Sequence, residues 1–237
     1  MDLTDLPRTL SQSRLPAVTW YGSTRTELSG TVAANWIVKT RNLLQDEFPP
    51  SWGDDARGTF AVVGTPTWRH LVWTASLWLD GWTLIEPDGQ RQWPHLILTT
   101  DVDGCDTDAS TDIVVALAPG PLDLVYPGDL PANSIDGVAD VAAQPDATIY
   151  AEGDHGTTPA LGNEKESIDE VVSATNTELP SVERLVLPAA DVPAMALAAL
   201  RQWAHGRGIV VIDRDLHDAD ALAGILAQER LDQGTDV

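Results

Sequence analysis

One loop of the sequence carries residue types that could hold a nucleotide phosphate. The stretch AEGDHGTTPA, residues 151–160, follows a short β-prone segment and combines glycines with threonines. Glycines leave backbone N–H groups free to point at phosphate oxygens, and threonine hydroxyls can donate to the same oxygens. The candidate phosphate-binding residues are consecutive: Gly153, Asp154, His155, Gly156, Thr157 and Thr158. The residue types of this loop therefore predict a position for a phosphate.

The charges of the same loop act against phosphate binding. Glu152 and Asp154 each place a negative charge close to where a phosphate would lie, and the loop contains no lysine. At an intermediate effective dielectric, each close pair of like charges costs on the order of a few kcal/mol. The two carboxylates should raise the pKa of His155, but one imidazolium would at best offset them. On these residues alone we expect a loop that has lost phosphate binding.

A second group of residues could bind a hard cation. Four aspartates fall within the stretch DVDGCDTDAS: Asp101, Asp103, Asp106 and Asp108. Clustered carboxylate oxygens suit calcium, but an EF-hand loop needs glycine at its sixth position and glutamate at its twelfth. This chain has Asp106 and Asp112 at those positions. A cation site and a solvated acidic loop are the two interpretations, and the partial match favours the solvated loop.

Nucleophilic catalysis finds little support in the sequence. There is no Gly-x-Ser-x-Gly motif, and the single cysteine, Cys105, lies in the acidic loop, which should raise the pKa of its thiol. His70 is expected to be packed and hydrogen-bonded within a tryptophan-rich helix, and His205 to interact with the dipole at a helix C-terminus. His95 and His217 have no evident partner. No Ser/His/Asp set can be assembled from this spacing.

The nine tryptophans could be interpreted as a ligand box. Trp68, Trp73 and Trp78 recur at intervals of five residues, which does not keep them on one face of a helix. Trp20 and Trp82 lie in strand-like stretches. Packing in the core and at its edges is therefore the favoured interpretation.

The elements that would position these groups alternate along the chain. A β-hairpin is expected over 18–28, followed by a helix over 30–48 that Ser29 can cap. Further strands are expected at 59–64, 82–87, 95–100, 112–117, 148–150, 184–188 and 208–212, and helices at 67–81, 134–143, 164–175, 193–205 and 218–230. Apolar strands that alternate with helices indicate an α/β fold with largely parallel sheets flanked by helices. We expect a first α/β subdomain over 1–145 and a second α/β unit over 146–237.

The overall charge limits the possible partners. Of 237 residues, 36 are acidic and 14 are lysine or arginine, which gives a formal net charge of −22. Such a surface repels nucleic-acid backbones and anionic lipids, so no nucleic-acid partner is expected. The N-terminal stretch lacks the pattern of a signal peptide, and no apolar run is long enough to cross a membrane. We therefore expect a cytoplasmic protein without membrane insertion.

The order of the elements resembles that of the adenylate-forming enzymes, which include acyl-CoA synthetases, luciferases and peptide-synthetase adenylation domains. VTWYGSTRTELS and ANWIVKTRNLL are similar to the opening hairpin and first helix of that family. TFAVVGTPTWRHLVWTASLWLDGWTLIEP resembles its next strand–helix–strand unit, and the segment from ERLVLP to AQERL resembles the part after its phosphate loop. The resemblance covers roughly residues 16–231. It implies a three-layer α/β fold, like part of the family's N-terminal domain.

The same resemblance sharpens the prediction for the loop. ATIYAEGDHGTTPAL falls where the family carries Ser-Gly-Thr-Thr-Gly-x-Pro-Lys, and both glycines of that motif are kept. Glu152 stands at its first serine, Asp154 and His155 replace two threonines, and Ala160 stands at its lysine. The chain ends at Val237, ahead of the family's adenine- and ribose-binding motifs and its catalytic lysine. We therefore expect a truncated relative with a degenerate phosphate loop.

Two interpretations of function follow from the resemblance. The leading one is an acyl-CoA-synthetase-like protein without adenylation activity, which acts as a binding, regulatory or oligomeric protein. It would need no cofactor and would associate with itself or with another protein. The alternative is a minimal AMP-forming acyl-CoA ligase, alone or with a partner chain, that uses ATP and magnesium at Gly153–Thr158. A surviving pocket for an acyl chain or a nucleotide, without chemistry, is a third possibility.

Overall fold

Two β-sheets organise the part of the chain that is described. The computed structural model describes residues 3–49, 57–86, 89–108, 112–149, 160–161, 166–167 and 183–231. Sheet A has the strand order β10-β11-β1-β2, with bounds β1 Pro16–Tyr21, β2 Arg25–Ser29, β10 Arg184–Pro188 and β11 Gly208–Ile212. Strands β1, β10 and β11 are parallel, and β2 closes a hairpin with β1. The N-terminal hairpin thus joins the last strands of the chain in one sheet.

Sheet B contains the middle of the chain, in the order β7-β6-β5-β3-β4-β8-β9. Its strands are β3 Thr59–Val63, β4 Thr83–Leu84, β5 His95–Thr99, β6 Asp112–Ala116, β7 Ser134–Asp136, β8 Ala160–Leu161 and β9 Glu166–Ser167. All neighbouring pairs are parallel except β8 with β9. Both sheets draw strands from either side of residue 145, and the division into 1–145 and 146–237 stays a prediction.

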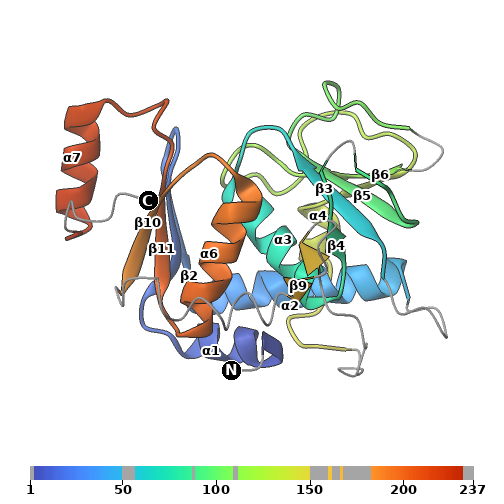
Figure 1. Ribbon diagram of the computed structural model, residues 1–237, viewed down its shortest axis with the longest axis horizontal. Helices are drawn as coiled ribbons and strands as arrows, with labels where there is room; N and C mark the ends of the chain where they lie inside the picture. Colours follow the sequence, from blue (N-terminus) through green and yellow to red (C-terminus); the bar gives the residue numbers. More distant parts are fainter. Residues whose placement is uncertain are drawn as a thin grey trace.

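Helices lie between the two sheets and on the outer side of sheet A. The helices are the 3-10 helix η1 Leu3–Asp5, then α1 Leu6–Gln12, α2 Gly30–Glu47, α3 Trp68–Leu79, α4 Ala139–Ala142, α6 Val192–Ala204 and α7 Ala219–Gln228. Figure 1 shows α3 and α6 between sheet A and sheet B, while α7 lies on the outer side of sheet A. The predicted three-layer α/β fold, with largely parallel sheets flanked by helices, is confirmed.

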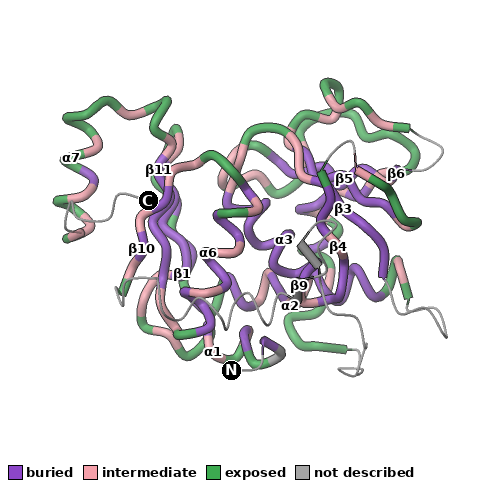
Figure 2. The backbone as a smooth tube through the Cα atoms, in the orientation of Figure 1, coloured by how far each residue is buried: buried purple, intermediate pink, exposed green. Residues whose placement is uncertain are grey.

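The alternation of apolar side chains in sheet A explains why helices cover both of its faces. Trp20 and Val211 face the main core with α6, whereas Tyr21 and Val210 face a second cluster with Ile225 of α7. The parallel strands β1, β10 and β11 therefore have apolar residues on both sides, which is typical of buried parallel strands. Figure 2 shows β1 and β11 as largely buried, whereas β2 at the edge alternates exposed and buried residues.

The expectation that the tryptophans pack in the core and at its edges is confirmed for most of those described, whereas Trp93 is 70% exposed. The indoles of Trp73, Trp78, Trp82 and Trp203 are among the largest fully buried side chains. Trp73 and Trp203 also donate from Nε1 to backbone carbonyls, at 3.0 and 2.9 Å, so their only polar atoms are paired. A buried indole with its N–H satisfied adds area to the core without an unpaired donor.

The segment 134–143, expected to be one helix, forms β7 followed by the short α4. Ile135 is buried and pairs with the neighbouring strand β6, which extends sheet B. The Asp136 carboxylate accepts hydrogen bonds from the N–H groups of Val138 and Ala139, both at 2.9 Å. These bonds close a turn between β7 and α4, whose N-cap position is Val138, and the prediction was wrong here.

Two other expected elements lie partly outside the described residues. Within the helix expected over 164–175, Glu166–Ser167 form strand β9, so these two residues are not helical; the rest is not described. Within the strand expected over 148–150, the N–H of Ile149 donates to the Asn42 side chain of α2 at 3.3 Å instead of joining a sheet. The strand expected at 82–87 is limited to Thr83–Leu84. The other expected strands and helices are confirmed.

Two glycines in helices should respond to the same substitution with opposite signs. A Cβ atom on Gly30, at the start of α2, would lie 2.0 Å from the carbonyl oxygen of Leu10 in α1, whereas a Cβ on Gly224 in α7 has no atom within 4 Å. Gly30→Ala should therefore lower the free energy of unfolding by about 1–3 kcal/mol, since α1 must shift. Gly224→Ala should raise it by about 0.5–1 kcal/mol, because alanine is the better helix former. Urea unfolding measures both, and changes of the same sign would contradict this account of the packing.

Candidate functional site

The carboxyl ends of the parallel strands of both sheets border one cleft. Its volume is about 140 Å³, and we call it the hydroxyl cleft. It is lined by Trp20, Gly22, Ser23, Thr24, Thr65, Pro66, Thr67, Trp68, Thr100, Pro119, Pro121, Asp213 and Leu216. These residues lie at or after the ends of β1, β3, β5, β6 and β11. Open α/β sheets bind their ligands at such an edge, so this cleft is the first candidate site.

Local geometry presents the hydroxyl groups of this cleft. Gly64 leaves β3 with a φ of +91°, and a Cβ atom there would lie 3.1 Å from Thr100 Oγ1. The Thr100 hydroxyl donates to the carbonyl of Thr65 at 3.2 Å, which ties the ends of β3 and β5 together. Only glycine adopts this backbone conformation without strain, so the turn that carries Thr65 and Thr67 depends on it.

His70 fixes the start of the helix that follows this turn. The N–H of Thr67 donates to His70 Nδ1 at 3.1 Å, and the imidazole is fully buried. Burial lowers the pKa of His70 to about 4, against a weaker opposite effect of the Val63 backbone. The side chain is thus neutral and acts as a cap, which confirms the expected packed and hydrogen-bonded histidine.

Arg69 holds the far wall of the hydroxyl cleft. Its buried guanidinium donates to the carbonyls of Ala118, Gly120 and Asp123, at 3.2, 2.7 and 2.8 Å, and more weakly to that of Pro121. Burial lowers the pKa of Arg69 to about 10, although Asp123 and Asp136 oppose the shift. The group remains protonated at neutral pH and is occupied by backbone carbonyls, so it is not directed at a ligand.

A larger cleft of about 570 Å³ lies between sheet B and the N-terminus of α6, and we call it the α6 cleft. Its lining comprises Val62, Val63, Gly64, Leu84, Ile85, Glu86, Ala190, Asp191, Val192 and Pro193. A helix N-terminus favours anions. Here the Asp191 carboxylate already caps the helix, accepting from the N–H of Ala194 at 3.1 Å. Glu86 adds a second carboxylate, so the cleft disfavours a further anion.

The two clefts both lack a cationic side chain among the described residues that line them. The hydroxyl cleft offers serine and threonine hydroxyls and the carboxylate of Asp213, whereas the α6 cleft offers the carboxylates of Glu86 and Asp191 on an otherwise apolar lining. Phosphate groups are held by cations and by backbone N–H groups in proteins. The linings therefore suit an uncharged or cationic group better than a polyphosphate.

The phosphate-loop-like residues predicted from the sequence are Gly153, Asp154, His155, Gly156, Thr157 and Thr158. All six lie outside the described residues. The next described residues, Ala160–Leu161, form β8 beside β4 in sheet B. Phosphate binding by this loop, and its loss, therefore stay predictions.

The acidic loop around Asp101 makes local hydrogen bonds. Asp101 Oδ1 accepts from the N–H of Gly104 at 3.0 Å, and Asp112 binds the Arg91 guanidinium at 2.5 Å. Within the described part of the chain, no group of three or more His, Cys, Asp or Glu side chains could hold a metal ion. Burial and then the charge of Asp101 raise the pKa of the Cys105 thiol, as expected, so it is a poor nucleophile at neutral pH.

The sequence missed the partners of two histidines. His95 Nδ1 lies 2.8 Å from Thr59 Oγ1 on the neighbouring strand β3, and the ring of His217 meets Tyr21 edge-on with 6.4 Å between ring centroids. Neither contact can be predicted from local spacing, because each partner lies on a strand that is far away in the sequence. Each contact places its histidine against a strand of a sheet and outside the lining of both clefts.

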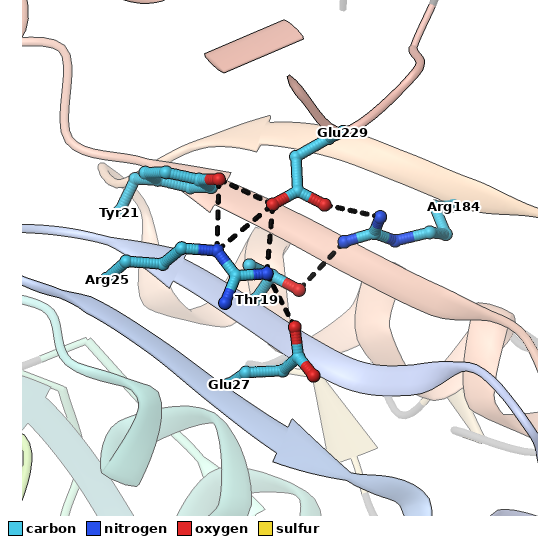
Figure 3. A network of polar contacts seen from close by, with 6 residues as sticks. All are labelled: Thr19, Tyr21, Arg25, Glu27, Arg184 and Glu229. Carbon is cyan, nitrogen blue, oxygen red and sulfur yellow. Dashed lines mark hydrogen bonds and ion pairs between the residues drawn. The ribbon is translucent and has the colours of Figure 1, made fainter. Parts of the chain in front are cut away.

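The sequence also missed a network around Glu229, shown in Figure 3, which we call the Glu229 network. The Glu229 carboxylate, only 6% exposed, accepts from Tyr21 Oη at 2.5 Å, Arg25 Nη2 at 3.0 Å and Arg184 Nη1 at 2.6 Å. Arg184 also donates to Thr19 at 2.8 Å. These residues join the end of α7 to β1, β2 and β10. The network therefore holds α7 on the outer face of sheet A, away from both clefts.

No helix in the described ranges combines the length and the apolar character that crossing a bilayer requires.

Comparison with known proteins identifies the fold. No protein-family model matches the chain, and no curated protein sequence does. Among solved structures, the N-terminal domain of FACL13 from Mycobacterium tuberculosis superposes with a TM-score of 0.62 at 13% identity, over 98% of this chain and 61% of that one. The acyl-CoA synthetase of Brucella canis gives 0.63 at 15% identity, over 98% and 46%.

A third similar structure is the N-terminal subdomain of Klebsiella oxytoca NpsA in complex with 3-hydroxybenzoyl-AMSN. It gives a TM-score of 0.59 at 12% identity, over 96% of this chain and 57% of that one. This chain thus spans between about half and three fifths of the length of these three structures, and a quarter of a larger peptide synthetase, FmoA3. At these identities the likeness establishes the fold, and the predicted resemblance is confirmed at that level.

Proposed function

We propose that this chain, which has the fold of the N-terminal region of acyl-CoA synthetases and adenylation domains, is a binding or regulatory protein without adenylation activity. The observation that supports the proposal is the lining of the hydroxyl cleft and the α6 cleft, whose described residues supply hydroxyls and carboxylates but no cation. The triphosphate of ATP would bring several negative charges to this edge, against Glu86, Asp191 and Asp213. In this proposal ATP, AMP and magnesium are not cofactors.

The departures in the phosphate-loop-like segment support the same proposal. Asp154 and Ala160 stand where the adenylate-forming enzymes carry a threonine and the lysine of the loop. With a formal net charge of −22, the protein is proposed to act in the cytoplasm, on a ligand or partner that is not a nucleic acid. The hydroxyl cleft would take a small uncharged or cationic group.

One observation favours the alternative, a minimal AMP-forming acyl-CoA ligase. The NpsA structure is an N-terminal subdomain in complex with 3-hydroxybenzoyl-AMSN, so that subdomain holds the compound without the rest of its enzyme. If the present chain retained such a site, Gly153–Thr158 would contact the phosphate or its replacement. Binding of an acyl-adenylate analogue is therefore the sharpest distinction between the two functions.

Calorimetric titration at low salt tests the proposal. The wild-type protein should release no heat with MgATP or with 3-hydroxybenzoyl-AMSN, and it should not release pyrophosphate from ATP with any of a panel of carboxylic acids. The variant Asp154→Thr, Ala160→Lys restores two residues of the family motif and serves as the matched control. Binding by this variant alone would identify a lost site on an intact scaffold. Micromolar binding of either compound by the wild type, or acid-dependent turnover, would overturn the proposal in favour of the ligase.

A further inference from the structure

The loop between β6 and β7, residues 117–133, has no regular secondary structure, but several side-chain hydrogen bonds hold it in place. The buried Arg69 guanidinium donates to four of its carbonyls, between 2.7 and 3.4 Å. Trp68 Nε1 donates to one of the same carbonyls, that of Pro121. The Asp123 carboxylate accepts from the N–H of Gly120 at 2.9 Å, which closes a turn within the loop. Burying a guanidinium is costly unless its donors are used. The Arg69 guanidinium, one of the few cationic side chains of the protein, therefore fixes this β6–β7 loop.

The same loop leaves three neighbouring apolar side chains exposed to water. Leu122 is 82% exposed, Leu124 80% and Val125 54%, three neighbours in a stretch of four residues. Single exposed leucines are common on protein surfaces, but a contiguous apolar group on a loop held in place is typical of an interaction site. Since Arg69 and Trp68 fix the backbone, little conformational entropy remains to be lost when a partner binds.

The chain around this loop is acidic, although Arg91 pairs with Asp112 and Lys39 with Asp146. From residue 92 to residue 164 the sequence contains no lysine or arginine. The described part of that stretch contains these aspartates: Asp101, Asp103, Asp106, Asp108, Asp112, Asp123, Asp129, Asp136, Asp140 and Asp146. The loop around Asp101 lies directly beside the β6–β7 loop, because the N–H of Val102 contacts the Tyr126 hydroxyl at 3.4 Å. The apolar group is therefore bordered by carboxylates.

The geometry points to a docking surface for an amphipathic, basic segment of another protein, in which leucine-like side chains cover Leu122, Leu124 and Val125 while lysine or arginine side chains meet the surrounding aspartates. Charge complementarity of this kind steers association and suppresses wrong partners. A second copy of this chain fits poorly, because two surfaces of the same kind would face each other with like charges on molecules of net charge −22.

The position of the docking surface connects it to the hydroxyl cleft. Pro119 and Pro121, at the base of the β6–β7 loop, line that cleft. Arg69 donates to the carbonyls of Gly120 and Pro121 and so fixes this base. A partner that covers the loop would therefore lie next to the cleft. The docking surface does not depend on what the cleft binds, so it stands with either of the two functions considered above.

Fluorescence anisotropy with a labelled synthetic helix of leucine and lysine tests the inference. The wild-type protein should bind this peptide, and Leu122→Ser, Leu124→Ser should weaken binding about tenfold or more, as for residues at the centre of an interface. Val32→Ser, which removes an apolar side chain 41% exposed on α2, is the matched control and should change the affinity less than about twofold. Raising the salt from about 50 to 300 mM should weaken binding, because it screens the aspartates.

Three results would overturn the docking surface. The first is equal binding of a peptide in which glutamate replaces every lysine. The second is an unchanged affinity in the Leu122→Ser, Leu124→Ser variant, which would place peptide binding elsewhere on the acidic surface. The third is a dimer of the wild type in light scattering that the double variant abolishes, which would make this surface an interface between copies of the chain. The double variant changes only exposed side chains, so its circular dichroism and unfolding midpoint should match the wild type.

Discussion

Replacing Asp80 with alanine should lower the free energy of unfolding by about 3–5 kcal/mol. The carboxylate follows helix α3, is fully buried and binds the Arg57 guanidinium at 2.6 Å. It also accepts from Gln45 Nε2 at 2.9 Å and Trp82 Nε1 at 3.1 Å. Alanine would leave the buried Arg57 guanidinium without its counter-ion, with only the backbone carbonyls of Phe48 and Asp80 as acceptors, and would leave two further donors unpaired. A buried charge without its partner is among the costliest defects in a core. Urea unfolding followed by tryptophan fluorescence measures the loss.

Asp5→Ala is the matched control for this prediction. Asp5 lies 3.9 Å from Arg8 at the surface, with 57% and 74% of the two side chains exposed, and it makes no capping hydrogen bond to α1. Exposed ion pairs contribute little, so the change should stay within about 1 kcal/mol. If both aspartates proved equally dispensable, the buried pair with Arg57 would not hold α3 to the end of α2 in solution.

Glu229→Ala should release helix α7 from sheet A. The substitution removes the acceptor of Tyr21, Arg25 and Arg184, and bonds of this kind to a charged group contribute about 1.5–3 kcal/mol. Because the described apolar contacts of α7 belong to the small cluster around Ile225, hydrogen exchange of its amides should accelerate about tenfold to a hundredfold. The rest of the fold should keep its protection. Glu27→Ala, which removes an exposed partner of the same Arg25, should leave the exchange of α7 unchanged.

The contribution of Glu229 should also disappear in acid. Burial alone would raise the pKa of this carboxyl, but the hydrogen bonds from Tyr21, Arg184 and Arg25 outweigh it and hold the pKa below the ordinary value of 4.5. A carboxyl with a lowered pKa in the folded state stabilises fully above its unfolded pKa, and the stabilisation is lost as the pH falls through the folded value. The difference between wild type and Glu229→Ala should therefore be constant above about pH 5 and shrink below pH 4.5. A difference that grew in acid would contradict this assignment.

Local signals in the sequence were sufficient for most of the fold. Ser29 and Asp218 cap α2 and α7 with their side chains, and Gly81 ends α3 with a φ of +86°, all at positions that short-range rules predict. Continuous apolar runs are a local signal of a buried parallel strand, and the run GIVVI forms the buried strand β11. The prediction for the segment 134–143 failed because its first three residues, Ser134–Asp136, form a strand whose partner β6 lies about 20 residues earlier in the chain.

The candidate site could not be predicted in the same way. The hydroxyl cleft combines Trp20 and Asp213 of sheet A with Thr65 and Thr100 of sheet B, and no local pattern brings these residues together. The Glu229 network likewise depends on pairs that are 45 to 208 residues apart. The glycine–threonine loop, by contrast, can be recognised in the sequence because its residues are contiguous. The partners that tertiary structure supplies carry no signal until the sheets are formed.

The parallel pairing of β1 with β11 has a consequence for how the protein is made. Val18 of β1 pairs with Ile209 of β11, so β11 leaves the ribosome about 190 residues after β1. At the usual rates of translation this corresponds to about 10–40 s, during which β1 has only β2 as a neighbour. Sheet B can form from consecutive strands within that time, whereas sheet A must wait for the last of its strands. We expect the nascent chain to form sheet B first and to complete sheet A only after β10 and β11 have been synthesised.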